Sequence, residues 1–424
     1  MNILNRLASA SLLLAATSAP ALAQLQNGEA PTPEQVAAGE VPATPVQEKE
    51  QAMRALQAQM AAVHWTRPAA QELLAYVQRI GEEGLDPLDY NADRLQAALA
   101  APDDAALSFI ATDIFLRVSA DLALGHARSD GRVDWFASDD DLDSNAQFAL
   151  MQRAIANSNV RDTLTSLLPT HPQYAELKAA LASAPDQATR DIVRANLDRW
   201  RWLPRDLGKR YVIVNVPAYT AALVEDGRVV ARHKVIVGKP DTATPQLSAV
   251  ATAVIFNPWW EVPDSIADEV KGKKGYVSVK NGDKVRYRQP PGPSNALGRM
   301  KVVMPNDYAI YLHDTPSKSL FSKQVRAFSH GCIRTQDALG FAQLLLANPE
   351  WDKAAINRAI ATKKTVKAEA TISTPIYIAY FTAAAIKDGG GIRTYPDLYA
   401  RDAKVVTVLN SRSGDVDVAS SGTR

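Results

Sequence analysis

Residues 328–346 read FSHGCIRTQDALGFAQLLL and contain Cys332, the only cysteine in the 424-residue sequence. The residues before the cysteine are strand-like, and those after it have the apolar spacing of a helix. Thr335 can cap a helix that begins near Gln336, with Asp337 in its first turn. Because the positive end of a helix dipole favours a thiolate, this arrangement predicts a reactive Cys332.

A thiol nucleophile also needs N–H donors for the developing negative charge and a base for its proton. Gly331 allows an unusual backbone conformation, so the N–H groups of His330, Gly331 and Cys332 can point at one oxygen as an oxyanion hole. Two bases are near in the sequence, namely His330, two residues before the cysteine, and His313, nineteen before it. The residue pattern alone leaves both open.

Further out from the cysteine, the apolar pattern has a period of two. RYVIVNVPAYTAALVEDGRVVARHKVIVG (210–238) indicates strands around a turn at Asp226-Gly227. More strands are expected at 250–257, 284–289, 300–305 and 309–314, and a final hairpin at 375–395. The cysteine therefore belongs to a mainly β domain.

Before about residue 200 the pattern is helical. Apolar residues recur three or four apart over 48–63, 69–84, 102–125 and 145–156. The chain is therefore expected to be α+β, with a helical N-terminal scaffold domain followed by a mainly β catalytic domain. The expected boundaries are 1–23 for a signal peptide, 24–47 for a flexible leader, 48–200 for the helical domain, 201–403 for the catalytic domain and 404–424 for a loose C-terminal tail.

The N-terminus has the three parts of a secretory signal. Arg6 supplies positive charge, residues 7–16 are apolar, and Ala21-x-Ala23 resembles a cleavage site. The apolar run is shorter than the roughly 20 residues that span a membrane. These features predict export to the periplasm.

Composition excludes some function classes. Removal of the signal leaves 46 basic and 46 acidic residues, so the mature chain has no charge excess for binding nucleic acid or an anionic membrane. A single cysteine also excludes an intrachain disulfide.

Two segments carry a family resemblance. YLHDTPSKSLF (311–321) and RAFSHGCIR (326–334) resemble the signature of L,D-transpeptidases with the YkuD catalytic domain. That signature is a histidine, about fifteen residues, then Ser-x-Gly-Cys-x-Arg. Here fifteen residues separate His313 from Ser329, and the remaining positions are filled by Gly331, Cys332 and Arg334.

The resemblance extends over about 70–403, to the large, YcbB-like branch. It is carried by 196–219, 237–245, 256–263, 288–306 and the closing YIAYFTA…YARDA. Two departures stand out. Residues 174–200 lead almost directly into the catalytic region, leaving no room for the branch's peptidoglycan-binding module. Residues 264–287 are a short capping segment, which implies a more open cleft.

The resemblance implies a cysteine acyltransferase of peptidoglycan. Cys332 would attack the L,D-bond carbonyl of a tetrapeptide stem, at its third residue, meso-diaminopimelate, and release D-alanine. An amine acceptor on a second stem would then take the acyl group. His313 matches the family's base, oriented by the backbone carbonyl near Asp314, and at His330 the backbone N–H matters more than the ring. Arg334 would brace the cysteine loop or bind a substrate carboxylate.

Other residues and readings stay open. Ser329 matches the signature as a supporting residue. Trp260, with Trp259, could shape the cleft, although large aromatics in a strand are more often core. The main alternative is an L,D-carboxypeptidase or endopeptidase, in which water resolves the same acyl-enzyme. A zinc hydrolase using His313, His330 and Cys332 matches no zinc spacing.

A wall-binding scaffold with a dead site is weaker still, because both reactive residues are present. No metal or organic cofactor is expected. The expected partners are peptidoglycan stem peptides, and the sequence leaves the acceptor and the oligomeric state open.

Overall fold

The structure is a computed structural model that describes residues 63–128, 131–137, 141–281, 284–386 and 391–411. The expected signal peptide and leader, and nearly all of the helix expected over 48–63, lie outside these ranges. The chain forms two compact units that alternate along the sequence. The first holds the described residues up to Ile80, then 87–122 and 142–167, and the second holds 81–86, 123–141 and the chain from Leu168 onward.

The first unit is helical, as its apolar spacing predicts. Its elements are α5 (Arg67–Gln78), η2 (Pro87–Tyr90), α6 (Ala92–Ala100), most of α7 (Asp104–Leu124), α8 (Ser144–Ala156) and α9 (Val160–Thr165). Thr66 caps α5 and Asp143 caps α8, each by accepting a backbone N–H. Leu73, Phe115 and Met151 are fully buried and form part of its core.

The second unit begins with helices and continues as a sheet. After η1 (Ile80–Glu83), α10 (Pro172–Ala182) and α11 (Gln187–Trp200), the chain enters β1 (Arg210–Asn215), β2 (Thr220–Glu225) and β3 (Arg228–Gly238). Asp226 and Gly227 both have positive φ between β2 and β3, as a two-residue hairpin turn requires. The predicted turn at this point is confirmed.

Nine strands form the main sheet. The others are β4 (Leu247–Phe256), β8 (Met300–Val303), β9 (Leu312–His313), β10 (Ala327–Ser329), β11 (Ile333–Thr335) and β12 (Val366–Ala379). Their order is β10-β3-β11-β9-β8-β4-β12-β1-β2, and β3 also pairs with β2, so the sheet closes on itself. The closed sheet places β9 beside β11, although a loop and β10 separate them in the sequence.

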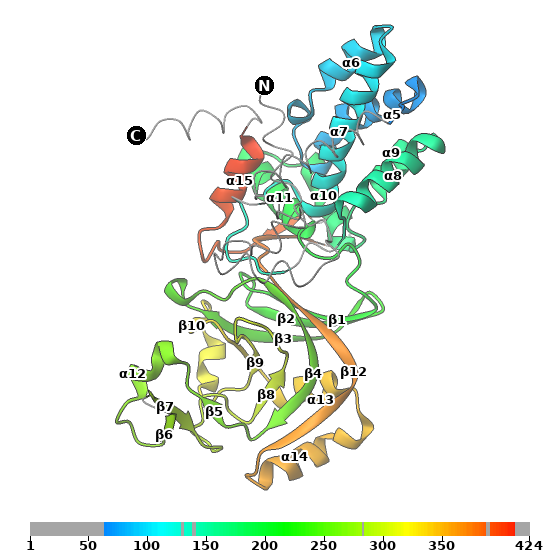
Figure 1. The fold of residues 1–424 in the computed structure, drawn as a ribbon. Helices are drawn as coiled ribbons and strands as arrows, with labels where there is room; N and C mark the ends of the chain where they lie inside the picture. The colour runs from blue at the N-terminus through cyan, green and yellow to red at the C-terminus, as the bar shows by residue number, and fades with distance from the viewer. Residues whose placement is uncertain (1–62, 129–130, 138–140, 282–283, 387–390, 412–424) are drawn as a thin grey trace, which may run out of the picture. The chain divides into compact units, whose positions relative to one another are not determined.

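One face of this sheet carries the core. Val212, Val254, Leu312 and Ile333 are fully buried there together with Phe341 of α13 (Ala338–Leu346). Helix α13 packs against β12, β4 and β8, and α14 (Lys353–Ala361) follows η6 (Pro349–Trp351) and packs against α13 and β4 (Figure 1). The side chains on the opposite face of β8, β9 and β11 are not part of this core.

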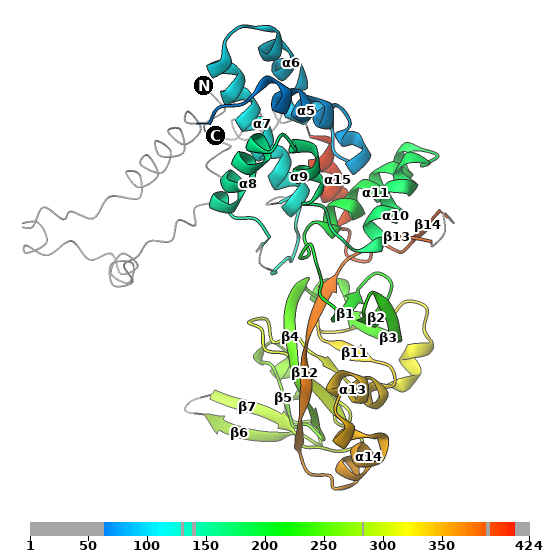
Figure 2. The same cartoon turned by 90° about the vertical axis from the view of Figure 1, so that its right-hand side faces the viewer.

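The capping segment, here taken as residues 259–289, contains a small second sheet. Its elements are β5 (Trp260–Glu261), η4 (Asp264–Ile266), α12 (Ala267–Val270), β6 (Val277–Asn281) and β7 (Lys284–Gln289), and the strand order is β5-β7-β6. Figures 1 and 2 both show β6 and β7 projecting beyond the edge of the main sheet. The α+β fold, with a helical region followed by a mainly β region, is confirmed.

Several local predictions are wrong. The helix expected to begin near Gln336 begins at Ala338, because β11 lies between the cysteine and the helix. Asp337, not Thr335, is the cap, and its carboxylate accepts the Gly340 N–H. Cys332 is therefore separated from the first residue of α13 by a short strand.

The C-terminal region also differs from expectation. The final hairpin is shorter than expected, with β13 (Ala383–Ala385) paired to β14 (Ile392–Thr394), and β12 belongs to the main sheet. The first residues of the expected loose tail lie in α15 (Asp402–Asn410), where Val405 and Leu409 are buried. The apolar spacing is of period two in 366–379 and helical in 402–410, but each stretch is short. Packing against the core stabilises the strand and the helix that form there. Among the described residues, no helix has the length and apolar character needed to cross a membrane.

Candidate active site

The register of three strands gathers the reactive residues on one face of the sheet. His313 of β9 pairs with Lys301 of β8 on one side and with Arg334 of β11 on the other. Paired residues of neighbouring strands share a face, and their sequence neighbours Leu312 and Ile333 are in the core. Lys301, His313 and Arg334 therefore form a row on the face opposite the core.

A second row lies next to the first. The Ile333 N–H donates to the Tyr311 carbonyl at 3.1 Å, which continues the β9–β11 ladder by one residue. Cys332 and Tyr311 are then neighbours, and Tyr311 packs edge-on to His313 with ring centroids 5.6 Å apart. Cys332 and His313, nineteen residues apart, are diagonal neighbours on adjacent strands.

The loop that presents the cysteine is held by the serine of the signature. The Ser329 hydroxyl donates to the Cys332 carbonyl at 2.6 Å and accepts the Gly331 N–H at 3.2 Å. Gly331 has φ of +108°, a conformation that side chains rarely adopt, and a Cβ there would lie 3.3 Å from Ile310 Cδ1. The half-buried Cys332 sits at the end of this turn, with its Sγ 3.6 Å from the Ala309 carbonyl oxygen.

The protonation of the thiol differs from the expectation. Burial raises the pKa of Cys332, an effect opposed by the N–H and hydroxyl of Tyr311 and by the charges of Lys301 and Arg334. The same burial and the sulfur raise the pKa of Tyr311, which holds its hydroxyl as a donor. Burial therefore acts against the thiolate that a helix start would favour, and β11 lies between Cys332 and the helix.

His313 is buried and held neutral. Burial, together with the charge of Arg334, lowers the pKa of His313 to about 3, while the carbonyl and carboxylate of Asp314 act in the opposite direction. Its Nδ1 is buried and has no hydrogen-bond partner among the residues that the structure describes. A neutral imidazole can accept a proton, which is the state that a general base needs.

The other histidine faces a different element. His330 is exposed, and its Nε2 lies 3.3 Å from Glu269 Oε1 of α12. Its ring therefore faces the capping segment, while its backbone remains next to Gly331. The position of the two rings favours His313 over His330 as the partner of the thiol.

Asp314 has a bracing position. It is almost fully buried, accepts the Arg299 N–H at 2.9 Å and forms an ion pair with Lys318. A Cβ at Gly298 would lie 2.5 Å from Asp314 Oδ2, so the glycine permits this close approach. These contacts fix the chain at the point where β9 leaves the sheet.

The two tryptophans belong to the capping segment. Trp260 is half-buried on β5 and packs against Tyr276, and its indole N–H donates toward the Tyr311 hydroxyl. Trp259 is exposed, with the Arg288 guanidinium 3.9 Å from its ring centroid. Trp260 therefore contacts the site through Tyr311, while Trp259 packs with Arg288.

The cysteine loop rests on the loop that follows β3. Thr244, fully buried, donates from its hydroxyl to the Gly331 carbonyl at 2.7 Å, and Thr242 donates to the Ser329 carbonyl at 3.1 Å. Tyr399, from the C-terminal segment, accepts the Thr244 N–H at 3.2 Å and donates to the Gly238 carbonyl at 2.8 Å. A residue 67 positions after Cys332 thus supports its loop.

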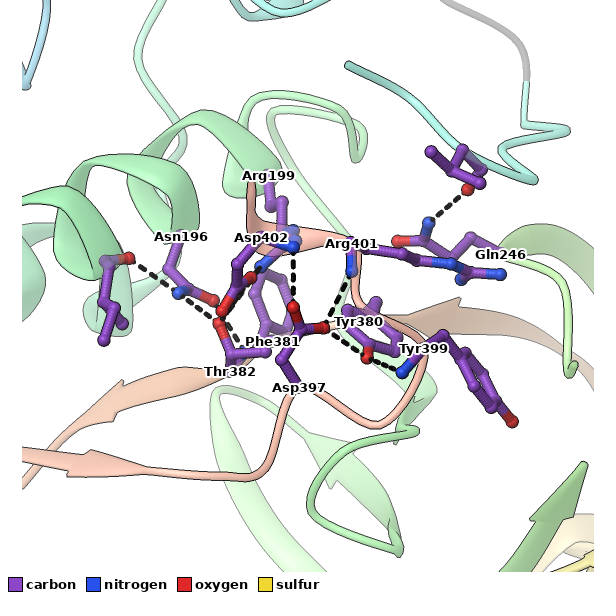
Figure 3. A network of polar contacts seen from close by, with 12 residues as sticks. Asn196, Arg199, Gln246, Tyr380, Phe381, Thr382, Asp397, Tyr399, Arg401 and Asp402 are labelled. Atoms are coloured by element: carbon purple, nitrogen blue, oxygen red, sulfur yellow. Dashed lines mark hydrogen bonds and ion pairs between the residues drawn. The ribbon is translucent and has the colours of Figure 1, made fainter. Parts of the chain in front are cut away.

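Figure 3 shows how the C-terminal segment is itself held. Arg199 of α11 pairs with Asp402 at 2.5 Å, and the Tyr380 hydroxyl donates to Asp397 at 2.7 Å. Arg401 pairs with Asp134 at 2.5 Å and stacks on Tyr380, and the whole network lies within the second unit. These contacts connect α11, the end of β12 and the start of α15.

A cavity of about 450 Å³ adjoins the cysteine loop at His330 and Gly331. Its wall includes Phe136 and Tyr308, whose rings stack with centroids 4.0 Å apart. Cys332 and His313 are not among the lining residues. In the described ranges, no group of three or more histidine, cysteine or acidic residues could hold a metal ion.

Sequence reasoning missed four residues that the structure brings to the site or its support: Lys301, Tyr311, Thr244 and Tyr399. Tyr311 could have been found, because it lies two residues before His313 on a strand and shares its face. Lys301 and the two support residues carry no local signal, because only strand order and loop packing bring them near Cys332.

Two family models match the chain. The YkuD model, described as the L,D-transpeptidase catalytic domain, matches residues 209–378, and the Scaffold domain model matches residues 51–181. A putative L,D-transpeptidase from Haemophilus influenzae is 28% identical over 284 residues, covering 59% of this chain and 57% of that protein. The chain therefore spans just over half the length of that relative. The YcbB-like branch stays a prediction.

Solved structures similar to this chain include an L,D-transpeptidase from Mycobacterium smegmatis, 17% identical over 40% of this chain and 58% of that one, with a TM-score of 0.22. L,D-transpeptidase 3 from Mycobacterium tuberculosis is 16% identical over 40% and 60%, with a TM-score of 0.23. From the family models, residues 209–378 are an L,D-transpeptidase catalytic domain of the YkuD family, and a Scaffold domain precedes it.

Proposed function

We propose that this protein is a peptidoglycan L,D-transpeptidase with Cys332 as nucleophile and His313 as general base. The observation that supports this most is the diagonal placement of the two residues on adjacent strands, within the part of the chain that the catalytic-domain model matches. The cysteine is half-buried beside a buried, neutral imidazole. These features suit transfer of the thiol proton as the sulfur attacks.

The proposed reaction has two halves. The Cys332 sulfur bonds to the carbonyl carbon of the third stem residue, and the thiol proton passes to His313. The C–N bond to D-alanine then breaks, the leaving amine takes that proton, and a thioester remains. An amine on a second stem attacks the thioester, and the cysteine leaves as thiol after His313 has relayed the proton.

We propose an oxyanion hole made from the cysteine loop and Tyr311. In the described part of the chain, the N–H groups of His330 and Cys332 have no hydrogen-bond acceptor, whereas the Gly331 N–H donates to Ser329. The Tyr311 hydroxyl beside the sulfur is a third available donor. Gly331 then shapes the turn, and its N–H can join the oxyanion hole only by releasing the Ser329 hydroxyl when substrate binds.

The supporting residues take roles from their contacts. Ser329 holds the cysteine loop, Asp314 holds the end of β9, and Trp260 positions the Tyr311 hydroxyl. Arg334, half-buried beside His313, lowers the pKa of the imidazole and offers a cation to the substrate. No step in this scheme calls for a metal or an organic cofactor.

We also propose the periplasm as the location, with peptidoglycan stem peptides as donor and acceptor. The domain limits at 48–200 and 201–403 stand as proposals, with the expected signal peptide outside the described residues. The alternative of an L,D-carboxypeptidase or endopeptidase shares the acyl-enzyme and differs only in the group that resolves it.

The test uses the mature protein and a purified disaccharide-tetrapeptide, with products identified by mass spectrometry. We expect D-alanine release together with a cross-linked dimer, and neither product with Cys332→Ala. Lys323→Met, an exposed substitution, is the control and retains both products. Tripeptide without dimer, with amine acceptors supplied, would establish the hydrolase. D-alanine release that survives Cys332→Ala would disprove the nucleophile.

A further inference from the structure

The active-site face carries two cations without acidic partners. Lys301 and Arg334 flank His313 in one row of the sheet, and both side chains are half-buried. Within the described ranges, neither lies at ion-pair distance from a carboxylate. The Nε of Arg334 is also buried and has no hydrogen-bond partner among the described residues.

Lys301 is the less expected of the two, because no signature position contains it. Its ammonium lies 4.7 Å from the centroid of the Tyr311 ring. Tyr311 is in turn the strand neighbour of Cys332, so Lys301 lies on the same part of this face as the sulfur, and its charge opposes the rise of the Cys332 pKa. Burial lowers the pKa of Lys301, so the folded protein holds this charge at a cost.

Two groups oppose the lowering of the Lys301 pKa, first the Cys332 thiol and then Glu261 of β5. Glu261, the carboxylate of the two, is exposed and lies 3.5 Å from Arg288. The buried Asp314 on the neighbouring strand is occupied by the Arg299 N–H and by Lys318. The acids near Lys301 are therefore engaged by other cations.

A half-buried ammonium that contacts a ring face and has no carboxylate partner among the described residues is suited to an anion that arrives with the substrate. A cation–π contact contributes less than an ion pair in a partly desolvated site, so a carboxylate entering the site would be favoured. The donor stem of the proposed function offers two carboxylates near the attacked bond. One is the terminal carboxylate of the leaving D-alanine, and the other is on the diaminopimelate side chain.

We propose that Lys301 is the binding residue for a carboxylate of the donor stem peptide. This inference rests on the proposed function. The carboxylate pairs with the Lys301 ammonium, which keeps its contact with the Tyr311 ring, so that binding of the donor also orders the hydroxyl next to the sulfur. Lys301 then favours donors that have a free carboxylate at the position that it binds.

The experiment compares three synthetic tetrapeptide donors by their kcat/KM for release of the fourth residue. One donor has both carboxylates, one has a C-terminal D-alaninamide, and one has the diaminopimelate side chain as a carboxamide. We expect the wild-type protein to disfavour one of the two amides about 30-fold, as loss of a charged hydrogen-bond partner implies. That amide identifies which carboxylate is bound.

The decisive variant is Lys301→Met, which keeps most of the side-chain volume and removes the charge. We expect it to lose activity about 30-fold on the unmodified donor and to treat that same amide as well as the parent donor. Lys301→Arg should restore part of the preference, and Lys323→Met, on the surface, should keep all of it.

Two outcomes would overturn the inference. If Lys301→Met slows all three donors equally, Lys301 acts on the thiol or the fold and not on a substrate carboxylate. If the wild-type protein accepts both amides as well as the parent donor, no carboxylate is read. Failure of the proposed function is distinct, because the wild-type protein would then release no fourth residue from any of the three donors.

Discussion

Cations with limited access to solvent have carboxylate partners in one region of the second unit and not in another. Arg199 and Arg401, both labelled in Figure 3, are nearly inaccessible. Arg199 pairs with Asp402, and Arg401 pairs with Asp134. On the face that carries Cys332 and His313, Lys301 and Arg334 are half-buried and have no carboxylate partner within the described ranges. The two nearly inaccessible arginines thus have carboxylate partners, and the two half-buried cations do not.

Under the proposed function, the difference follows from what each region does. A buried charge without a partner is costly, so a region that only stabilises the fold pairs its charges. A site that must bind an anion leaves its cations unpaired, because a built-in carboxylate would compete with the substrate. The cost of leaving these cations unpaired is then part of how the proposed site binds its substrate. The paired network supports the C-terminal segment, whose Tyr399 contacts the loop under Cys332.

The largest expected effect tests the active-site face. His313→Ala should lower kcat/KM for D-alanine release about 10²- to 10⁴-fold, the usual contribution of a general base. Its melting temperature should change little by comparison with Arg199→Met below. The measurement is steady-state kinetics with the tetrapeptide donor, with His330→Ala as the matched control, because the His330 ring faces Glu269. If His330→Ala causes the larger loss, the assignment of the base is wrong.

The next effect tests the paired network. Arg199→Met should lower the free energy of unfolding by about 3–5 kcal/mol, since it leaves a shielded Asp402 and the Thr382 hydroxyl without their cation. Chemical denaturation followed by tryptophan fluorescence measures this loss. Adding Asp402→Asn should recover part of it, because the unpaired carboxylate is then removed. A loss confined to activity would contradict the comparison.

The smallest effect compares two imidazoles whose pKa is lowered by burial, the half-buried His171 outside the active-site face and the buried His313 on it. His171, stacked on Trp200, accepts the Gln173 N–H at its Nδ1, and burial lowers the pKa of His171 to about 4. Burial lowers the pKa of His313 to about 3. Both side chains bind fewer protons in the folded than in the unfolded state below pH 6.5, so stability falls as pH falls from about 6.5 to about 4.

Each imidazole contributes up to about 1.4 kcal/mol per pH unit to that slope. His171→Asn keeps a cap acceptor for α10 and removes one titrating group, so it should flatten the fall in unfolding free energy by up to that amount. Denaturation curves measured from about pH 4.5 to about pH 7, a range that covers most of this fall and its upper limit, check this. An unchanged slope would mean that His171 is protonated in the folded protein.

The local predictions succeeded where short-range chemistry decides the outcome. The turn at Asp226-Gly227 was predicted because only residues that accept positive φ fit it. The helix after Cys332 begins two residues later than predicted, because the predicted cap Thr335 ends β11, which pairs with β3 and β9, and Asp337 caps the helix instead. Strand pairing outweighed the local capping preference of Thr335 there.

The sequence alone predicted Cys332 and His313 as the reactive pair, because their types and spacing match the signature that the chain resembles. It also predicted a helical region followed by a mainly β region, because the apolar period changes from 3.6 to 2. Only the tertiary structure placed Lys301 and Tyr311 at the sulfur and Tyr399 under its loop. Those neighbours depend on strand order and loop packing, which join residues far apart in the chain and leave no local pattern.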